Sequence, residues 1–255
     1  MHRISAVVIT KNEEINIGKT LAALTNVADE IIIVDNFSKD NTVEICKTFA
    51  AKIFLSEWRG FGLQKNFGIQ QSSCNYILAL DADEVLTQQA IEEIIGLKTK
   101  VMTGVYEFPL LNFYFGKFLK HGQEYPNVKK RLFDKTIVMW NENPVHEALI
   151  IPEGCPIIKL KGHIEHYSYT TIAHYIAKSN AYTSIGAEDL KNKDKKNYLI
   201  KMIFSPPFVF FKSYFLKKGF LDGTHGFVVA IFNAYTNFLK YAKLWELYRN
   251  ERAAS

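Results

Sequence analysis

A short apolar run that ends in three acidic residues is the feature that most constrains this fold. Residues 77–80 are apolar, and Asp81, Ala82, Asp83 and Glu84 follow directly. An apolar run of this length is typical of a buried strand. Open α/β sheets bind their ligands at the carboxyl ends of such strands. Because two carboxylates at this spacing suit a hard divalent cation, which often accompanies phosphates, we predict a cation and phosphate site here. An acidic turn without a ligand is the alternative.

The first 100 residues alternate between β-branched runs and segments with helical periodicity. The expected strands span residues 4–9, 30–34, 52–55 and 76–80, each followed by an expected helix. These helices end near residues 25, 50, 71 and 97. An alternation of this kind with short connections predicts an α/β fold, in which helices cover both faces of a mostly parallel sheet.

Polar residues follow three of these strands. Thr10 and Glu13 follow the first strand, Asp35 ends the second, and Asp81 and Asp83 end the fourth. Because the carboxyl ends of parallel strands meet at one edge, this pattern favours a ligand site. The chain lacks GxGxxG after the first strand and lacks GxxxxGK[ST], which argues against a dinucleotide site and a P-loop NTPase.

Three segments together resemble family 2 glycosyltransferases with a GT-A fold. They are VVITKNEE at residues 7–14, IIIVDNFSKDNT at residues 31–42, and the Asp-Ala-Asp signature at residues 81–83. Further segments resemble the subgroup that includes bacterial lipopolysaccharide-core β-glucosyltransferases, and they lie at residues 130–133, 140–147 and 162–169. The resemblance covers most of the chain and implies a Rossmann-like nucleotide-diphospho-sugar transferase fold.

The resemblance also implies roles for the residues at the strand ends. Asp35 would reach the base, and Lys65 would lie near the nucleotide, where many relatives have Arg. Asp83 would ligate Mg²⁺ or Mn²⁺ bridging the diphosphate, and this cation would offset the charge of the leaving group. The residues implied to bind the nucleotide-sugar are Thr10, Glu13, Asp35, Lys65, Asp81, Ala82 and Arg131.

Sugar transfer also needs a base, because an acceptor hydroxyl is a poor nucleophile until its proton is removed. Glu147 is the expected base, and Pro144 three residues earlier should fix its loop. Many family members place an Asp in a later Glu-Asp pair, and Asp189 of Glu188-Asp189 is the alternative here. That pair falls in a predicted helix at residues 171–191, where a solvated face is the plainer interpretation.

Histidines and one arginine complete the candidate set. His166 follows a predicted strand and is a second candidate metal ligand, which His146 and His163 could join. Arg131 could hold a phosphate through two parallel hydrogen bonds. A packed or surface position is the alternative for each. The Gln/Arg-x-x-Arg-Trp motif of processive synthases is absent, which favours transfer of a single sugar.

The last stretch of the chain differs in composition. Residues 200–255 contain 8 basic and 3 acidic residues, so the first 199 contain 23 of each, and the stretch is rich in Phe and Tyr. We expect Pro206, Pro207 and Lys212 to prevent a spanning helix and the segment to lie on an anionic membrane surface. Packing on the catalytic domain or another subunit is the alternative. The expected domains are a GT-A catalytic domain at 1–196, with a nucleotide-binding half (1–100) and an acceptor-binding half (101–196), and a helical extension at 197–255.

These features predict a metal-dependent inverting hexosyltransferase. It would move one sugar, glucose or another hexose, from a UDP-linked donor to a lipid-anchored or lipopolysaccharide-core glycan. Three cysteines without a CxxC motif and no visible signal peptide predict a cytoplasmic protein, bound peripherally to the inner membrane. No nucleic-acid-binding motif accompanies the basic residues. The alternatives are a nucleotidyltransferase and a silent glycan- or nucleotide-sugar-binding module, and the oligomeric state stays open.

Overall fold

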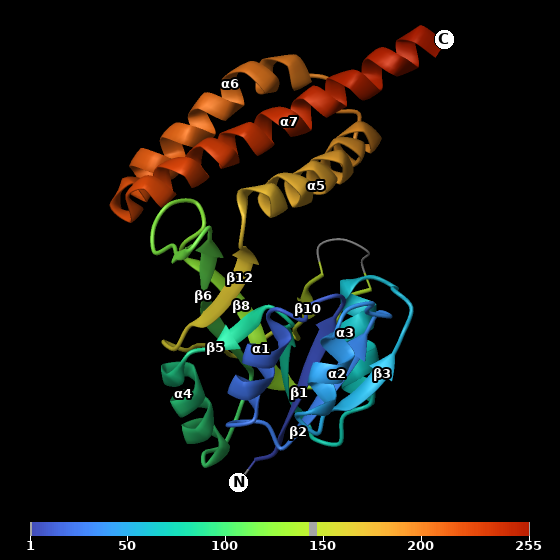
Figure 1. Cartoon of the computed structure of the whole chain (residues 1–255), viewed down its shortest axis with the longest axis vertical. Helices are drawn as coiled ribbons and strands as arrows, with labels where there is room; N and C mark the ends of the chain where they lie inside the picture. The colour runs from blue at the N-terminus through green and yellow to red at the C-terminus, as the bar shows by residue number, and fades with distance from the viewer. Residues whose placement is uncertain (1, 143–146, 255) are drawn as a thin grey trace. The chain divides into compact units, whose positions relative to one another are not determined.

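The computed structural model describes residues 2–142 and 147–254 (Figure 1). The chain divides into two compact units, each continuous in space but not in sequence. The first unit comprises Met1–Leu110 and Asn127–Tyr167, and the second comprises Leu111–Pro126 and Ser168–Ser255. Each unit is described by itself below.

Up to α4 the strands and helices follow the order that the alternating pattern predicts, with the short strand β5 in addition. The strands are β1 (Ile4–Thr10), β2 (Glu30–Asp35), β3 (Lys52–Leu55), β4 (Tyr76–Asp81), β5 (Glu84–Leu86), β6 (Val105–Tyr114), β7 (Lys117–Phe118), β8 (Asn127–Asp134), β9 (Met139–Trp140), β10 (Leu149–Ile150), β11 (Ile157–Lys159) and β12 (Ile164–Tyr169). The helices are α1 (Ile17–Leu24), α2 (Thr42–Lys47), α3 (Phe61–Gln70), α4 (Gln88–Lys98), α5 (Ile172–Asn192), α6 (Tyr198–Phe211), η1 (Lys212–Leu216), η2 (Gly219–Asp222) and α7 (Thr224–Ala254).

A mixed sheet carries the strand ends that matter for function. Its order is β3-β2-β1-β4-β8-β6-β12-β5. The strands β3, β2, β1 and β4 are parallel, which confirms the predicted α/β arrangement. From β4 onward the sheet is antiparallel, because β8 runs antiparallel to both of its neighbours, β4 and β6. The carboxyl end of β4 therefore lies where the parallel half meets the antiparallel half.

Two apolar cores cover the two faces of the parallel half. Side chains alternate in direction along a strand, so neighbouring residues of β1 enter different cores. Val8 packs with Leu21 of α1 and Ile94 of α4 on one face. Val7 packs with Ile69 of α3 on the other face. Helices on both faces leave only the strand ends of this sheet open, and this restricts where polar ligands can approach.

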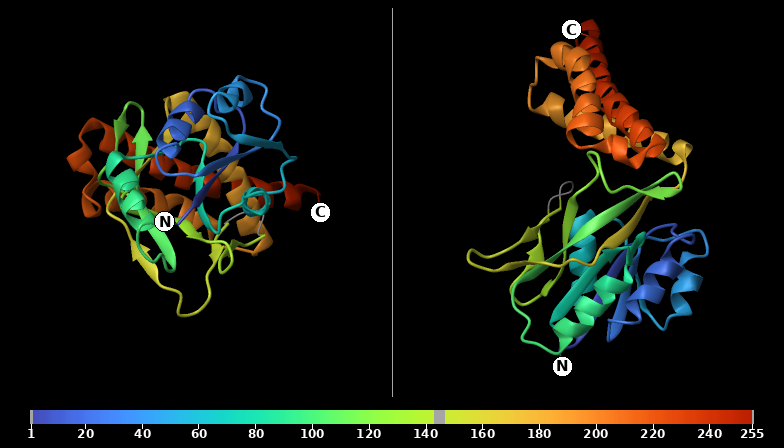
Figure 2. Two further views of the ribbon diagram at one scale, coloured as in Figure 1. Left: turned by 90° about the horizontal axis from the view of Figure 1, so that it is seen from below. Right: turned by 90° about the vertical axis from the view of Figure 1, so that its left-hand side faces the viewer.

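The second unit contains three long helices. In both views α6 and α7 run side by side, and α5 lies along α7 (Figures 1 and 2). The expectation that Pro206 and Pro207 break the helix is wrong, because α6 continues through both and passes into the π-helix η1. Tyr198–Leu216 is the stretch of the described chain that could cross a membrane by length and composition, with a mean hydropathy of 1.3 and 6% burial. Packing along α7 offsets the loss of the backbone hydrogen bonds that Pro206 and Pro207 cannot donate.

Candidate active site

The parallel strand register brings the predicted polar residues to one edge of the first unit. Thr10 at the end of β1 pairs with Asp35 at the end of β2. On the other side of β1, Ile9 pairs with Asp81 at the end of β4. Three side chains that are up to 71 positions apart in the sequence therefore lie together at the ends of neighbouring strands. This is the edge where open α/β sheets bind ligands.

Buried polar side chains lie at the ends of β1 and β2. Asp35 is fully buried, and its carboxylate accepts hydrogen bonds from the backbone N–H (2.8 Å) and the hydroxyl (2.5 Å) of Ser38. The buried hydroxyl of Thr10 has no hydrogen-bond partner among the described residues. An unpaired buried hydroxyl in a native fold calls for an explanation, and a bound ligand is one.

Glu13 lies in the loop between β1 and α1. Its backbone N–H donates to the hydroxyl of Thr42 at 2.7 Å, and Asn16 donates to its carboxylate at 3.2 Å. Thr42 is the first residue of α2, so this bond joins the loops that follow β1 and β2. The loop is thereby held beside the polar strand ends, and the Glu13 side chain stays partly exposed.

Asp81 lies between two cations. Its Oδ1 is 3.0 Å from Lys65 Nζ, and its Oδ2 accepts a hydrogen bond from Arg131 at 2.8 Å. Arg131 also pairs with Glu84, whose Oε2 accepts the backbone N–H of Asp81 at 3.1 Å. Lys65 comes from helix α3 and Arg131 from β8, the strand paired with β4, so a helix and a neighbouring strand hold one carboxylate. Both oxygens of Asp81 are thus already engaged by the protein.

Electrostatics keep Asp81 ionised. Burial acts to raise its pKa, but the neighbouring Arg131 and Lys65 hold the pKa of Asp81 well below its usual range. The two carboxylates raise the pKa of Arg131, although burial opposes this. Burial and the charge of Asp81 raise the pKa of Glu84, against the effect of Arg131. A buried ion pair with several hydrogen bonds is costly to break, so the cluster fixes the β4 end rigidly.

Lys65 connects this cluster to the predicted base. Its side chain is 1% exposed, and Nζ lies 3.6 Å from Glu147 Oε1 as well as 3.0 Å from Asp81. The same ammonium lies 4.6 Å above the ring of Trp140. Two carboxylates and an aromatic face surround one buried cation, which is the environment that offsets the cost of its burial. Glu147 therefore lies beside the acidic strand end.

Asp83 and His166 form the second half of the acidic strand end. Asp83 Oδ2 lies 3.4 Å from His166 Nε2, and both side chains are partly exposed. The backbone between the two aspartates is also fixed, since the carbonyl of the buried Ala82 accepts a hydrogen bond from Thr20 at 2.7 Å. Burial lowers the pKa of His166, but the neighbouring carboxylates, Asp83 first, raise it overall.

A divalent cation fits the Asp83–His166 pair as a shared site. Carboxylate oxygen binds Mg²⁺ or Mn²⁺, imidazole nitrogen binds divalent transition metals such as Mn²⁺, and donor atoms about 3 Å apart can share one ion. Asp81 is engaged on both oxygens and does not fit as a ligand. Among the described residues, no group of three or more His, Cys, Asp or Glu side chains could hold a metal ion. The remaining positions around a cation would suit diphosphate oxygens.

Other predicted residues lie elsewhere. Asp189 is exposed on α5 of the second unit and pairs with Lys193 at 2.7 Å. His146 and Pro144 lie outside the described residues. The backbone carbonyl of His163 accepts from Thr87, which caps α4. Sequence reasoning left Glu84 unassigned and did not identify Trp140. The cluster of three acidic residues at positions 81–84 already contained a signal for Glu84, but its partner Arg131 lies 47 positions away.

Comparison with known proteins places this geometry in an enzyme family. The family model described as glycosyl transferase family 2 matches residues 5–143, more than half of the chain. The segment contains the strand ends with Thr10, Asp35 and Asp81 and the partner residue Arg131. The chain therefore belongs to glycosyltransferase family 2 and is a glycosyltransferase with the GT-A fold.

Relatives match nearly the whole chain. An uncharacterized glycosyltransferase of Rickettsia typhi is 33% identical over 97% of this chain and 88% of its own. The lipopolysaccharide core biosynthesis glycosyltransferase LpsC of Rhizobium meliloti is 28% identical over 95% of this chain and 92% of its own. Among solved structures, TarS residues 1–349 of S. aureus in complex with UDP aligns with a TM-score of 0.47 at 13% identity, covering 98% of this chain and 92% of that one. The predicted family is confirmed, with a lipopolysaccharide-core enzyme among the relatives.

Proposed function

We propose that the protein transfers one hexose, with inversion, from a UDP-linked donor to a lipid-anchored glycan of the lipopolysaccharide-core type. The observation that carries this proposal is the arrangement around Lys65. The donor-side carboxylate Asp81 and the candidate base Glu147 lie 3.0 and 3.6 Å from one buried ammonium. The lipopolysaccharide-core relative supports the acceptor class.

The strand ends of β1 and β2 supply the nucleoside side of the site. Asp35 accepts from the base, Thr10 and Glu13 line the pocket, and the unpaired hydroxyl of Thr10 gains a ligand partner. Asp81 and the Ala82 backbone lie against the ribose and sugar, and Lys65 and Arg131 keep Asp81 in place. A buried carboxylate held by two cations needs no reorganisation when the donor binds, which favours a preformed site.

Asp83 and His166 hold the divalent cation together with the diphosphate. When bound, Mg²⁺ or Mn²⁺ offsets the negative charge that develops on the departing nucleoside diphosphate. Around this point the carboxyl groups of Asp81, Asp83, Glu84 and Glu147 outnumber the two basic side chains Lys65 and Arg131. An excess of carboxyl groups of this kind attracts a divalent cation, and it also explains the raised pKa of His166.

Glu147 acts as the base. Its carboxylate takes the proton of the acceptor hydroxyl while the new bond from that oxygen to the anomeric carbon forms. The bond from the anomeric carbon to the diphosphate breaks on the opposite face, which inverts the configuration. Lys65 orients Glu147 through the ion pair between them at the start of this step. General-base catalysis of this kind contributes roughly 10²–10⁴-fold to a rate.

The second unit supplies the membrane side. The exposed apolar and aromatic residues of α6 and α7, together with the basic excess of residues 200–255, support peripheral association with the cytoplasmic face of the inner membrane. A lipid-anchored acceptor is available only at such a surface. The domain division at residue 196 and the base assignment to Glu147 in place of Asp189 belong to this proposal.

Two substitutions separate donor binding from chemistry. Asp83→Asn should lower the affinity for UDP in the presence of Mn²⁺ by at least roughly tenfold and leave metal-free UDP binding unchanged, because one cation ligand is lost. Glu147→Gln should keep Mn²⁺-dependent UDP binding and lower turnover by roughly 10²–10⁴-fold. Titration calorimetry measures the first effect, and UDP release from a panel of UDP-sugars measures the second. Glu153→Gln, the same change at an exposed position, is the matched control.

The by-product identifies the reaction class. Release of a nucleoside diphosphate supports sugar transfer, whereas release of pyrophosphate would indicate nucleotidyl transfer. Donor binding without any release across the panel would indicate a silent binding module. Normal turnover by Glu147→Gln would remove this residue from the mechanism and make Asp189 the next candidate.

A further inference from the structure

One side-chain amide of α3 bonds to the strand that precedes the candidate base. Asn66 donates from Nδ2 to the backbone carbonyl of Trp140 at 2.9 Å, and its Oδ1 accepts the backbone N–H of Trp140 at 3.1 Å. Trp140 ends β9, which pairs with β10. The amide of Asn66 therefore satisfies both backbone groups of Trp140, as a neighbouring strand would.

A glycine one turn earlier on α3 lets the helix and this strand approach closely. A Cβ atom at Gly62 would lie 2.0 Å from the backbone carbonyl oxygen of Asn141, far inside van der Waals contact. Gly62 and Asn66 are four positions apart, so they share the helix face that is turned toward β9. Any side chain at Gly62 would push Asn141 away. Two independent contacts thus fix the distance between α3 and the end of β9.

Asn141 connects this contact to the candidate base. Its backbone N–H donates to the carbonyl of Ala148 at 2.8 Å, and its side-chain Oδ1 accepts the N–H of Ala148 at 3.1 Å. Ala148 directly follows Glu147. The pairing continues along β9 and β10, where Trp140 lies opposite Leu149. The backbone beside Glu147 is therefore anchored to α3 through the end of β9.

The residue that precedes Asn66 holds the donor side of the site. Lys65 lies 3.0 Å from Asp81 and 3.6 Å from Glu147. Its ammonium also lies over the ring of Trp140. This ion pair orients the carboxylate of Glu147, but the flexible stem of a lysine does not set the place of the backbone that carries it. A planar amide with two hydrogen bonds to backbone groups does so.

We propose that Asn66 is a positioning residue for the base. Together with Gly62 it holds the β9–β10 pair at the place from which Glu147 reaches the acceptor hydroxyl. The inference rests on the proposed role of Glu147 and adds the element that sets its position. One helix then aligns both partners of the reaction, since Lys65 and Asn66 are consecutive residues. A misplacement of about 1 Å can lower a rate by roughly 100-fold.

A bond between a helix and a strand can also serve stability alone, and the two roles differ in what a substitution changes. A contact that only stabilises lowers the free energy of unfolding and leaves the turnover of folded molecules unchanged. A positioning contact lowers the turnover of folded molecules and keeps donor binding. It has no further effect once the base itself is removed.

The test compares kcat and UDP binding of the full-length protein. Asn66→Leu removes both hydrogen bonds to Trp140 and keeps a side chain of similar shape. It should lower UDP release from the UDP-sugar that the wild type cleaves fastest by roughly 10–100-fold. The Kd for UDP in the presence of Mn²⁺ should stay within about twofold of the wild type. Gly62→Ala should have the same two effects, because it displaces Asn141.

Matched controls make the same changes away from this strand. Asn26→Leu removes a side chain that donates to the carbonyl of Ala22 at 2.9 Å, just after α1. Gly96→Ala adds a methyl group on α4, where a Cβ atom has no neighbour within 4 Å among the described residues outside its own helix backbone. Both variants should keep kcat and the Kd for UDP within about twofold of the wild type.

A double-mutant cycle connects the effect to the base. In the Glu147→Gln background, Asn66→Leu should lower kcat by less than about twofold, because the group that Asn66 positions is already gone. A contact that supports the domain in general would lower kcat by the same factor in both backgrounds.

Fluorescence follows the strand itself. With Trp58→Phe and Trp245→Phe, Trp140 is the remaining tryptophan, and its side chain is 5% exposed. Asn66→Leu should raise the quenching of its emission by acrylamide at least roughly threefold, because the end of β9 opens more often. Asn26→Leu should leave this quenching unchanged.

Four results would overturn the inference. They are a wild-type kcat in Asn66→Leu, an equal loss of kcat in the wild-type and Glu147→Gln backgrounds, a lowered kcat with unchanged quenching of Trp140, and loss of Mn²⁺-dependent UDP binding by Asn66→Leu. The last result would mean that the amide supports the whole domain. Normal turnover by Glu147→Gln, or no UDP release by the wild type, would instead refute the proposed function and the inference with it.

Discussion

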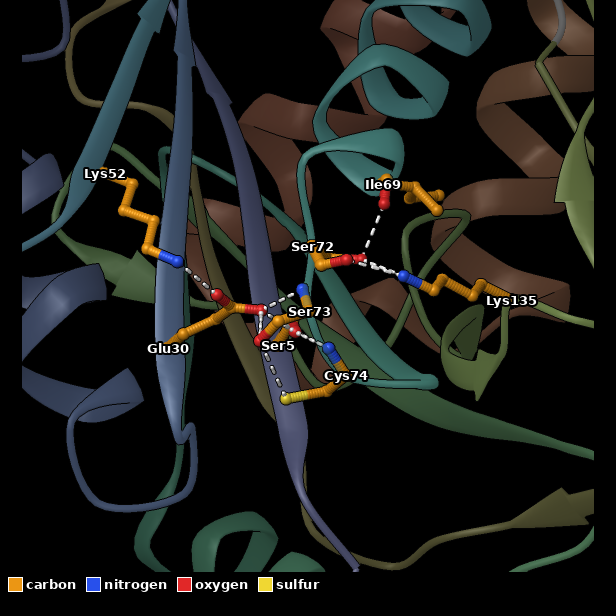
Figure 3. A network of polar contacts seen from close by, with 8 residues as sticks. All are labelled: Ser5, Glu30, Lys52, Ile69, Ser72, Ser73, Cys74 and Lys135. Atoms are coloured by element: carbon orange, nitrogen blue, oxygen red, sulfur yellow. Dashed lines mark hydrogen bonds and ion pairs between the residues drawn. The ribbon is translucent and has the colours of Figure 1, made fainter.

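Glu30 ties together the amino-terminal edge of the sheet, opposite the candidate site. It is the first residue of β2, and its carboxylate accepts hydrogen bonds from Ser5, from Lys52 (2.8 Å), and from the backbone N–H (2.5 Å) and hydroxyl (2.9 Å) of Ser73 (Figure 3). These partners belong to β1, β3 and the segment before β4. One side chain that is 8% exposed therefore joins four segments.

Its titration gives the magnitude. Burial acts to raise the pKa of Glu30, but the hydrogen bonds from Lys52, Ser5 and Ser73 lower it from 4.5 to about 2. At about 1.4 kcal/mol per pKa unit, the ionised form favours folding by about 3 kcal/mol. Because the pKa is lower in the folded state, this stability is fully present above pH 4.5 and is lost as the pH falls toward 2.

We therefore expect Glu30→Gln to lower the free energy of unfolding by about 2–3 kcal/mol at neutral pH. At about pH 3 roughly half of this difference should remain, since the wild-type carboxylate is then almost fully protonated in the unfolded state but still largely ionised in the folded state. Urea unfolding followed by circular dichroism at both pH values measures it. Glu44→Gln is the control, because Glu44 forms an exposed pair with Lys47 and should matter by less than about 1 kcal/mol.

Two results would refute this reasoning. A loss below about 0.5 kcal/mol at neutral pH would mean that the hydrogen bonds of Glu30 only replace its bonds to water. A difference between wild type and variant that stays constant down to about pH 3 would mean that lost packing, and not the carboxylate charge, causes the effect. Mn²⁺-dependent UDP binding by Glu30→Gln should stay unchanged, because the network lies at the other end of the strands.

Further predictions concern buried charge and cysteine reactivity. Arg131→Met should lower the free energy of unfolding by about 3–5 kcal/mol in urea titrations, because Asp81 and Glu84 would lose their buried partner; a loss under about 1 kcal/mol would contradict the ion-pair cluster. Burial raises the pKa of the Cys46 thiol to about 12, so iodoacetamide at about pH 8 should label the partly exposed Cys155 and spare Cys46 in the native protein, as peptide mass spectrometry would reveal.

The parallel half of the fold could be predicted from the sequence because its signals are local. Each strand is a short apolar run that ends in a polar residue, as Thr10, Asp35 and Asp81 illustrate. The antiparallel half could not be predicted in this way. β8 joins the sheet through long-range pairing with β4 and β6, and its side chains do not alternate between buried and exposed, since Lys129 is exposed whereas residues 131–133 are all buried. Register in such strands depends on partners that local periodicity does not reveal.

The continuous helix through Pro206 and Pro207 shows that a strong local sequence signal can also predict the wrong structure. The local rule that proline ends a helix is a statement about backbone hydrogen bonds and one preceding turn. In α6 that local cost competes with packing against α7, a 31-residue helix that follows in the sequence. Tertiary contacts therefore outweighed a strong local signal. The two proline rings that were expected to end the helix line an apolar groove between α6 and α7.

The acidic strand end shows why residue types alone could not assign roles within the site. The spacing of Asp81 and Asp83 suits a divalent cation but does not by itself distinguish the two carboxylates. In the fold they differ, because Lys65 and Arg131 occupy both oxygens of Asp81, whereas Asp83 faces the partly exposed His166. The difference arises from α3, β8 and β12, which lie outside the motif. A motif of this kind thus specifies where charge gathers, and the elements packed around it decide which carboxylate stays available for a ligand.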